Sequence, residues 1–162
     1  MGFPISPGSL FNFNQSAFEK LELFEEILKT KLGKSPFLHP DETGFNIQGK
    51  RNWLHCLSSD KLTLLYPHQK RGHEAMDEMG ILSKYHGTLC HDHLKPYYRY
   101  TCKHALCNAH HIRELERAIE QDNQQWAERM QKLLLEFNQV VKESDGFLVK
   151  ASAKAFRVQY IK

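Results

Sequence analysis

The sequence predicts an α/β fold in which helices cover a mixed β-sheet. Three short runs rich in aromatic and branched residues follow one another between residues 36 and 68, and further short runs then alternate with helical patterns up to residue 146. Consecutive strands separated by turn residues are typical of an antiparallel meander, whereas alternation of strands with helices is typical of parallel pairing. With 162 residues, 41% hydrophobic and 25% charged, the chain is long enough for one globular domain with a core.

The first expected element is an amphipathic helix over residues 16–32. Its apolar residues recur at steps of three and four, and Ser16 with Glu19 matches the capping box that begins helices. The remaining elements are strands at 37–47, 52–59 and 61–68, a short helix at 71–80, a strand at 87–90, a tyrosine-rich helix or loop at 94–100, a strand at 104–109, and helices at 110–122 and 123–144. Asp122 and Asn123 mark the break between the last two helices.

This order of elements is that of the ribonuclease-H-like fold, in which the first strand and the strand after the first helix lie side by side. The order therefore predicts that Asp41, in "FLHPDETGFNI", and Asp92, after "GTLC", are neighbours in space although 92 − 41 = 51 positions separate them. We expect a helical segment over residues 1–34, the ribonuclease-H-like core over 35–146 and a basic tail over 147–162.

Two carboxylates at adjacent strand ends suit a hard divalent cation, Mg²⁺ or Mn²⁺, which prefers oxygen ligands and can serve phosphoryl transfer. Each acid alone also has a structural explanation, since Asp41 can start a turn toward Gly44 and Asp92 can cap a helix near Leu94. The occurrence of both acids at matching places favours the metal site. Glu42 is expected to shape the turn rather than to bind metal.

Four cysteines and ten histidines are the unusual part of the composition. Cys107 and His110 form a C-x-x-H pair that, with cysteines and a histidine nearby in sequence, can be assembled into a zinc site. The other interpretation places Cys107 in a core strand and His110, His111 and Arg113 at a helix N-terminus that receives DNA phosphates. The sequence leaves both interpretations open.

The net charge of +3 is a weak indication of a nucleic-acid partner, but its distribution is informative. The tail from Phe147 to Lys162 holds Lys150, Lys154, Arg157 and Lys162 without any acid, which favours contacts to DNA phosphates. We expect this tail to be frayed or irregularly docked. No apolar run approaches the roughly 20 residues that span a bilayer, and the N-terminus does not have the pattern of a secretory signal. A cytoplasmic protein that does not enter membranes is expected.

Four blocks together carry a resemblance to a known family: "HPDETGFNIQGKRNWLH", "PHQKRGHEAMDEMGI", "GTLCHDHLKPYYRY" and "HALCNAHHIRELER". They resemble the central catalytic region of transposases of the insertion sequence 66 family, of the Asp-Asp-Glu type. The resemblance implies a ribonuclease-H-like core, Mg²⁺ or Mn²⁺ as cofactor, transposon ends and target DNA as partners, self-association of the full-length enzyme and a place at the bacterial nucleoid. Asp41 matches the first catalytic acid of the family and Asp92 the second.

The family's third acid is a glutamate farther downstream than Lys162, so the chain is expected to be a truncated catalytic core that does not cleave DNA by itself. Three alternatives stay open. Glu114 can serve as a third acid in a compact nuclease, the chain can be a zinc-stabilised DNA-binding module, or it can be an inactive transposase remnant.

Overall fold

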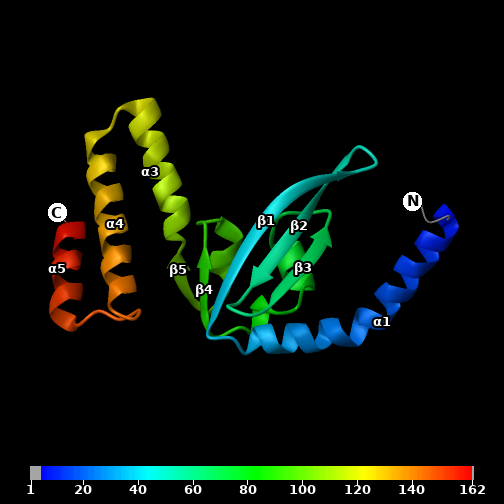
Figure 1. Ribbon diagram of the computed structural model, residues 1–162. Helices are drawn as coiled ribbons and strands as arrows, with labels where there is room; N and C mark the ends of the chain where they lie inside the picture. Colours follow the sequence, from blue (N-terminus) through cyan, green and yellow to red (C-terminus); the bar gives the residue numbers. More distant parts are fainter. Residues whose placement is uncertain (1–4, 162) are drawn as a thin grey trace. The chain divides into compact units, whose positions relative to one another are not determined.

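The computed structural model describes residues 5–161, and the chain divides into two compact units, the first ending at Leu106 and the second beginning at Cys107 (Figure 1). The first unit contains, in chain order, α1 (Pro7–Gly33), β1 (Phe37–Ile47), β2 (Lys50–Ser58), β3 (Thr63–His68), α2 (His73–Glu78), η1 (Leu82–Lys84), β4 (Thr88–His91), η2 (Lys95–Arg99) and β5 (Lys103–Leu106). The second contains α3 (Asn108–Asp122), α4 (Gln125–Glu143) and α5 (Lys150–Ile161). Each unit is described by itself.

The first unit is built on a five-stranded mixed sheet with the strand order β3-β2-β1-β4-β5. The first three strands form the predicted antiparallel meander, and β1 pairs in parallel with β4, which confirms both the α/β class and the predicted neighbourhood of these two strands. A two-residue turn joins β1 to β2. Its residues Gln48 and Gly49 both have positive φ, 49° and 77°, as the tight turns favoured in hairpins require.

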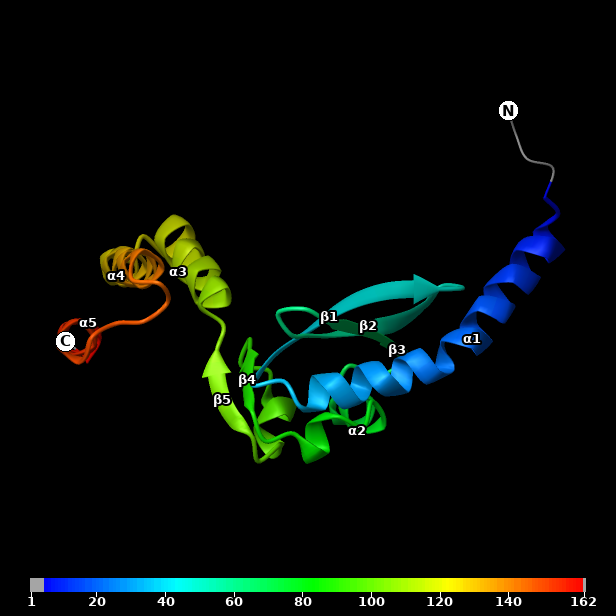
Figure 2. The ribbon, with the colours of Figure 1, turned by 60° about the horizontal axis from the view of Figure 1, so that its bottom comes forward.

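The core of the first unit lies on one face of the sheet. Four strands each contribute one leucine that is at most 4% exposed, namely Leu38, Leu57, Leu64 and Leu89. These leucines pack with Leu28 and Leu32 of α1, with Met76 of α2 and with Met79, which directly follows α2. In Figure 2, α1 and α2 accordingly lie on the same side of the sheet. Side chains that alternate with these point to the opposite face, where Phe37 and Leu65 are more than half exposed.

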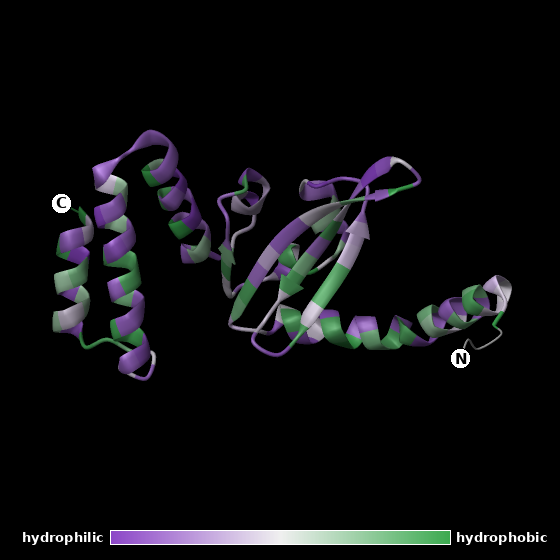
Figure 3. Cartoon of the chain, turned by 45° about the horizontal axis from the view of Figure 1, so that its top comes forward, coloured by the Kyte–Doolittle hydropathy of each residue, from purple (hydrophilic) through white to green (hydrophobic). Residues whose placement is uncertain are grey.

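Helix α1 begins earlier than predicted. Ser6 is its N-cap and accepts a hydrogen bond from the Ser9 N–H, with Pro7 in the first turn, so the proposed capping pair of Ser16 and Glu19 lies inside the helix. The prediction of a start at Ser16 was wrong because nothing between Gly8 and Gly33 interrupts the helix, and residues three apart are neighbours in a helix interior as well as at its start. Only the last turns of α1 reach the core, and apolar residues occur along its whole length (Figure 3).

The second unit is helical throughout its regular elements. Asn123, in the left-handed conformation, ends α3 and confirms the predicted break before α4. The C-terminal stretch, expected to be an irregular tail, forms α5, and Phe156 of α5 contacts Phe137 of α4 with ring centroids 5.0 Å apart. Trp126 of α4 is 53% exposed. No helix within residues 5–161 is long and apolar enough to cross a membrane.

Candidate active site

The pairing of β1 with β4 relates Asp41 to Asp92. The paired residues are Phe37 with Thr88 and Leu38 with Leu89, an offset of 88 − 37 = 51 positions, and Asp41 and Asp92 differ by the same 92 − 41 = 51. Beyond Leu38, β1 pairs with β2 and β4 pairs with β5, so the sheet opens where the two acids lie. Ligands of open α/β sheets bind at the carboxyl ends of strands at such a place.

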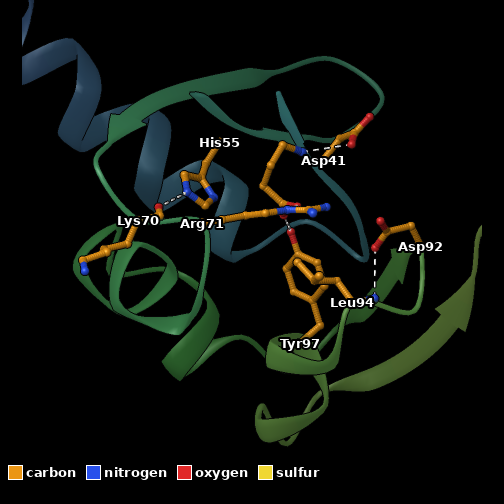
Figure 4. A network of polar contacts seen from close by, with 8 residues as sticks. Asp41, His55, Lys70, Arg71, Asp92, Leu94 and Tyr97 are labelled. Carbon is orange, nitrogen blue, oxygen red and sulfur yellow. Dashed lines mark hydrogen bonds and ion pairs between the residues drawn. The ribbon is translucent and has the colours of Figure 1, made fainter. Parts of the chain in front are cut away.

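Both carboxylates are held by a backbone N–H on one oxygen. Oδ1 of Asp41 accepts from the N–H of Glu42 at 2.9 Å, and Oδ1 of Asp92 accepts from the N–H of Leu94 at 3.0 Å (Figure 4). Within the described part of the chain, neither Oδ2 has a hydrogen bond. Asp92 thus has the capping role considered from sequence and still presents a free oxygen.

The turn role considered for Asp41 is absent. Asp41 lies inside β1, which continues to Ile47 before turning at Gln48, so the alternative of a turn beginning at Asp41 does not hold. The physical reason is that Gly44 does not break the strand, because β2 pairs with β1 over its whole length from His39 to Ile47. The first acid is therefore fixed by a regular strand.

Glu42 does not shape a turn either. It follows Leu38 and Pro40 on the core face of β1, and its side chain is only 1% exposed. The carboxylate accepts hydrogen bonds from the Tyr97 hydroxyl and from Nε of Arg71, the latter at 3.4 Å. Burial raises the pKa of Glu42, and the bond from Tyr97 and the charge of Arg71 oppose that rise. Period-two alternation was the sequence signal that could have predicted this burial.

Tyr97 of η2 donates a hydrogen bond from its hydroxyl to Glu42. Its ring is buried, and burial is the main cause that raises its pKa, followed by the charge and the hydrogen bond of Glu42. The charges of Asp92 and Asp41 raise the pKa of Tyr97 further. Tyr97 therefore remains a neutral hydrogen-bond donor.

Arg71 lies against Trp53 of β2, with the guanidinium carbon 5.0 Å from the ring centroid. The preceding residue is also fixed, because buried His55 donates from Nε2 to the carbonyl oxygen of Lys70 at 3.0 Å. Figure 4 shows the Arg71 side chain extending toward the side of the view on which Asp92 lies. Sequence reasoning missed this residue because its partners, Glu42 and Trp53, come from two strands that precede it in the chain.

His91, next to Asp92, is packed in the interior and is 1% exposed. His104 donates from Nε2 to the Tyr100 carbonyl, so its Nδ1 accepts from Nε2 of His91 at 3.1 Å. Nδ1 of His91 consequently carries no proton, and it is buried without a hydrogen-bond partner among the residues described. Burial, followed by the charge of His104, lowers the pKa of His91. The lowered pKa favours the neutral form of His91.

Comparison with known proteins decides the family. A family model described as "Transposase IS66 family" matches residues 1–160. The chain belongs to the IS66 transposase family. Comparisons with curated proteins and with solved structures gave no match. Membership gives the chain a transposase-related function, in a family whose members act on DNA and generally use divalent metal ions.

In this IS66-family chain, the other predicted site residues lie in the second unit. The carbonyl of Cys107 accepts from the N–H groups of His110 and His111 at the start of α3, and Nδ1 of His110 is buried without a partner among the described residues. Nδ1 of His111 lies 3.7 Å from a carboxylate oxygen of Glu114, and Arg113 donates to a carbonyl of its own helix. Within residues 5–161, no three His, Cys, Asp or Glu side chains are grouped to hold a metal. The zinc site stays a prediction.

Three of the four basic residues of the expected tail are exposed on α5, and the fourth, Lys162, lies outside the described residues. Lys150, Lys154 and Arg157 stand at positions i, i+4 and i+7, so a helix places them on one face. The sequence identified the residues, but the irregular conformation expected for the tail concealed that they form a stripe.

Proposed function

We propose that Asp41 and Asp92 hold a divalent cation, Mg²⁺ or Mn²⁺, and that this site serves DNA strand cleavage and transfer in the transposase. The observation that supports the proposal is the common offset of 51 positions, which places both acids at the same level of the sheet where β1 and β4 separate. Residues 35–146 are then the catalytic core, as proposed from sequence.

The residues present fit such an ion. Both donors are carboxylates, which hard cations prefer, and each has one oxygen engaged by a backbone N–H while the other has no hydrogen bond in the described part of the chain. Two neighbouring carboxylates repel each other, and a bound cation offsets that repulsion. When bound, the metal would supply activation of an attacking oxygen and stabilisation of a leaving oxygen in phosphoryl transfer.

The protein's part in this function is positioning. The N–H groups of Glu42 and Leu94 orient the two carboxylates, and Tyr97 stays protonated beside them, so it adds no further negative charge. Orientation of reacting groups is a large part of catalysis of phosphoryl transfer, which gives these backbone contacts a functional value.

The proposed partners are transposon ends and target DNA, with His110, His111 and Arg113 at the start of α3 and the basic stripe of α5 as contacts to phosphates. Self-association of the transposase and a nucleoid location belong to the same proposal. Helix N-termini and exposed cations are common contacts for the DNA backbone. These contacts carry no sequence information, so binding to arbitrary duplex DNA is expected.

The proposal is tested by the dependence of DNA affinity on a divalent cation. Binding of a short fluorescent duplex is measured by anisotropy in EDTA and in Ca²⁺, which has similar ligand preferences. We expect Ca²⁺ to strengthen binding about tenfold, because the cation bridges the carboxylates to a phosphate. Asp41→Asn and Asp92→Asn should each remove this gain, whereas Asp60→Asn, in the exposed β2–β3 loop, should keep it. Retention of the gain in both site variants would place the cation elsewhere.

Salt dependence tests the basic stripe. Replacing Lys150, Lys154 and Arg157 together by alanine should weaken binding and reduce the slope of log affinity against log salt by about 2 to 3, since each phosphate contact contributes about 0.9. The measurement is a salt titration of the same duplex in EDTA.

A charge-matched control removes three exposed lysines from the region of α1, namely Lys20, Lys31 and Lys34. This control should leave the slope nearly unchanged. Equal slopes for both triple variants would show that net charge, rather than the α5 stripe, determines binding.

A further inference from the structure

We infer that Arg71 binds a phosphodiester of the DNA backbone beside the Asp41–Asp92 site, and that Glu42 and Trp53 position its guanidinium for this contact. The location beside a metal site rests on the proposed function. The phosphate contact itself does not.

The Glu42 and Arg71 side chains differ in exposure, and this difference suits a role for Glu42 in positioning the Arg71 guanidinium. The Glu42 side chain is 1% exposed, but that of Arg71 is 42% exposed, so the carboxylate lies beneath a guanidinium that reaches the surface. Arg71 uses Nε, at 3.4 Å, and within the described residues its two terminal nitrogens have no hydrogen bond. A guanidinium has five N–H donors, and a purely structural pair would commonly be bidentate. Donors therefore remain for a ligand.

The Trp53 ring and the loop restrict the orientation of the guanidinium. Stacking at 5.0 Å limits the guanidinium plane while leaving its edge accessible. The loop is held by the bond from His55 to the Lys70 carbonyl and by the Lys70 N–H, which donates to Nδ1 of His68 at 2.9 Å. An arginine ordered in this way loses less conformational freedom on binding than a free surface side chain.

The acidic residues near Arg71 favour an anionic ligand that binds together with a divalent metal ion. Glu42 follows Asp41 directly in β1, the pairing of β1 with β4 relates Asp41 to Asp92, and the Tyr97 hydroxyl donates to Glu42. Arg71 contacts Glu42, and Figure 4 shows its side chain extending toward the side of the view on which Asp92 lies. A phosphodiester matches the planar fork of arginine, and the metal would neutralise the carboxylates that otherwise repel it.

The test uses the 162-residue chain and the fluorescent duplex in EDTA and in Ca²⁺. Arg71→Gln should lower affinity about tenfold in both buffers and reduce the salt slope by about 1. Arg71→Lys should keep the salt slope with a smaller loss of affinity, because the charge remains but the fork is lost. The matched control is Arg51→Gln, which removes the same charge from a side chain that also stacks on Trp53, at 4.8 Å, and it should stay within about twofold of the wild type.

Coupling with the acids distinguishes a local contact from general electrostatics. In Ca²⁺, the effects of Arg71→Gln and Asp92→Asn should be non-additive, because both side chains act on one phosphate, whereas Arg51→Gln and Asp92→Asn should be additive. Arg71→Gln with wild-type affinity in both buffers, or an equal loss from Arg51→Gln, would overturn the phosphate contact. Additivity with Asp92→Asn would overturn its location beside the Asp41–Asp92 site.

The fold of every variant is checked by circular dichroism and thermal unfolding, because Arg71→Gln leaves Glu42 without its cation. Glu42→Gln combined with Arg71→Gln removes both charges and should lose DNA affinity as Arg71→Gln does. If either variant unfolds, Arg71→Lys still shows whether DNA binding depends on the planar guanidinium or only on a positive charge. Loss of affinity in EDTA reports on Arg71 alone, and loss of the Ca²⁺ effect in Asp92→Asn reports on the proposed function alone.

Discussion

Asp41→Asn and Asp92→Asn are each expected to weaken Mn²⁺ binding at least about tenfold, and the double variant to abolish saturable binding. A site with two carboxylates should bind the ion weakly, with a dissociation constant of about 10⁻⁴ to 10⁻³ M. Asparagine keeps the size of the side chain and its ability to accept from the N–H of Glu42 or Leu94, so the loss would report on charge rather than on folding. The measurement is the concentration of free Mn²⁺ by electron paramagnetic resonance.

Two further acids serve as controls for this experiment. Asp60→Asn removes a carboxylate from an exposed loop and should not change Mn²⁺ affinity. Glu114→Gln tests the alternative third acid on α3, which pairs with His111 within the second unit. A loss of affinity for Glu114→Gln as large as for Asp92→Asn would revive the compact-nuclease interpretation, and unchanged affinity in both aspartate variants would refute the metal site.

Gly87→Ala is expected to destabilise the first unit by about 3 kcal/mol, at the upper end of overpacking effects. A Cβ at this position would lie 2.2 Å from the Tyr85 hydroxyl oxygen and 2.7 Å from the Pro36 carbonyl oxygen. Tyr85 is buried, and the Pro36 carbonyl accepts from the N–H of Thr88 where β1 and β4 begin to pair, so neither neighbour can easily move. Urea unfolding measures the loss.

Gly33→Ala is the matched control, since a Cβ at Gly33 would meet no atom within 4 Å. Alanine should keep or raise the free energy of unfolding, by up to about 1 kcal/mol, because glycine is a poor helix former. Gly87→Ala should also weaken Mn²⁺ binding, because the pairing that it disturbs sets the offset between Asp41 and Asp92. Stability equal to that of the wild type would show that the β1–β4 junction is less closely packed than described.

The sequence allowed the sheet to be predicted because its strands are marked locally. Aromatic and branched runs end at turn residues, and the Gln48–Gly49 turn matches a common hairpin geometry. Strand order then followed from element order, which placed β1 beside β4 and so related Asp41 to Asp92. The two acids were predictable because parallel neighbours present the same ends at one edge of the sheet.

The errors share a physical cause. The start of α1 was misplaced because the i, i+3 spacing of Ser16 and Glu19 also occurs inside helices, and the cap that is used, at Ser6, lies beyond the apolar pattern. The tail was expected to be irregular, although α5 packs Phe156 on Phe137 of another helix. Local patterns do not show which distant side chain completes an element.

The sequence by itself determined the strands, their order and the pair of acids that the sheet brings to one level, because these depend on alternation and on the direction of the chain. Only the tertiary structure decided that Glu42 is buried beneath Arg71 and bonded by Tyr97, while Asp41 next to it stays exposed. Their opposite environments arise because successive strand residues face opposite sides of a sheet, and only the packing of α1, α2 and the 3-10 helices on one side makes that side the interior.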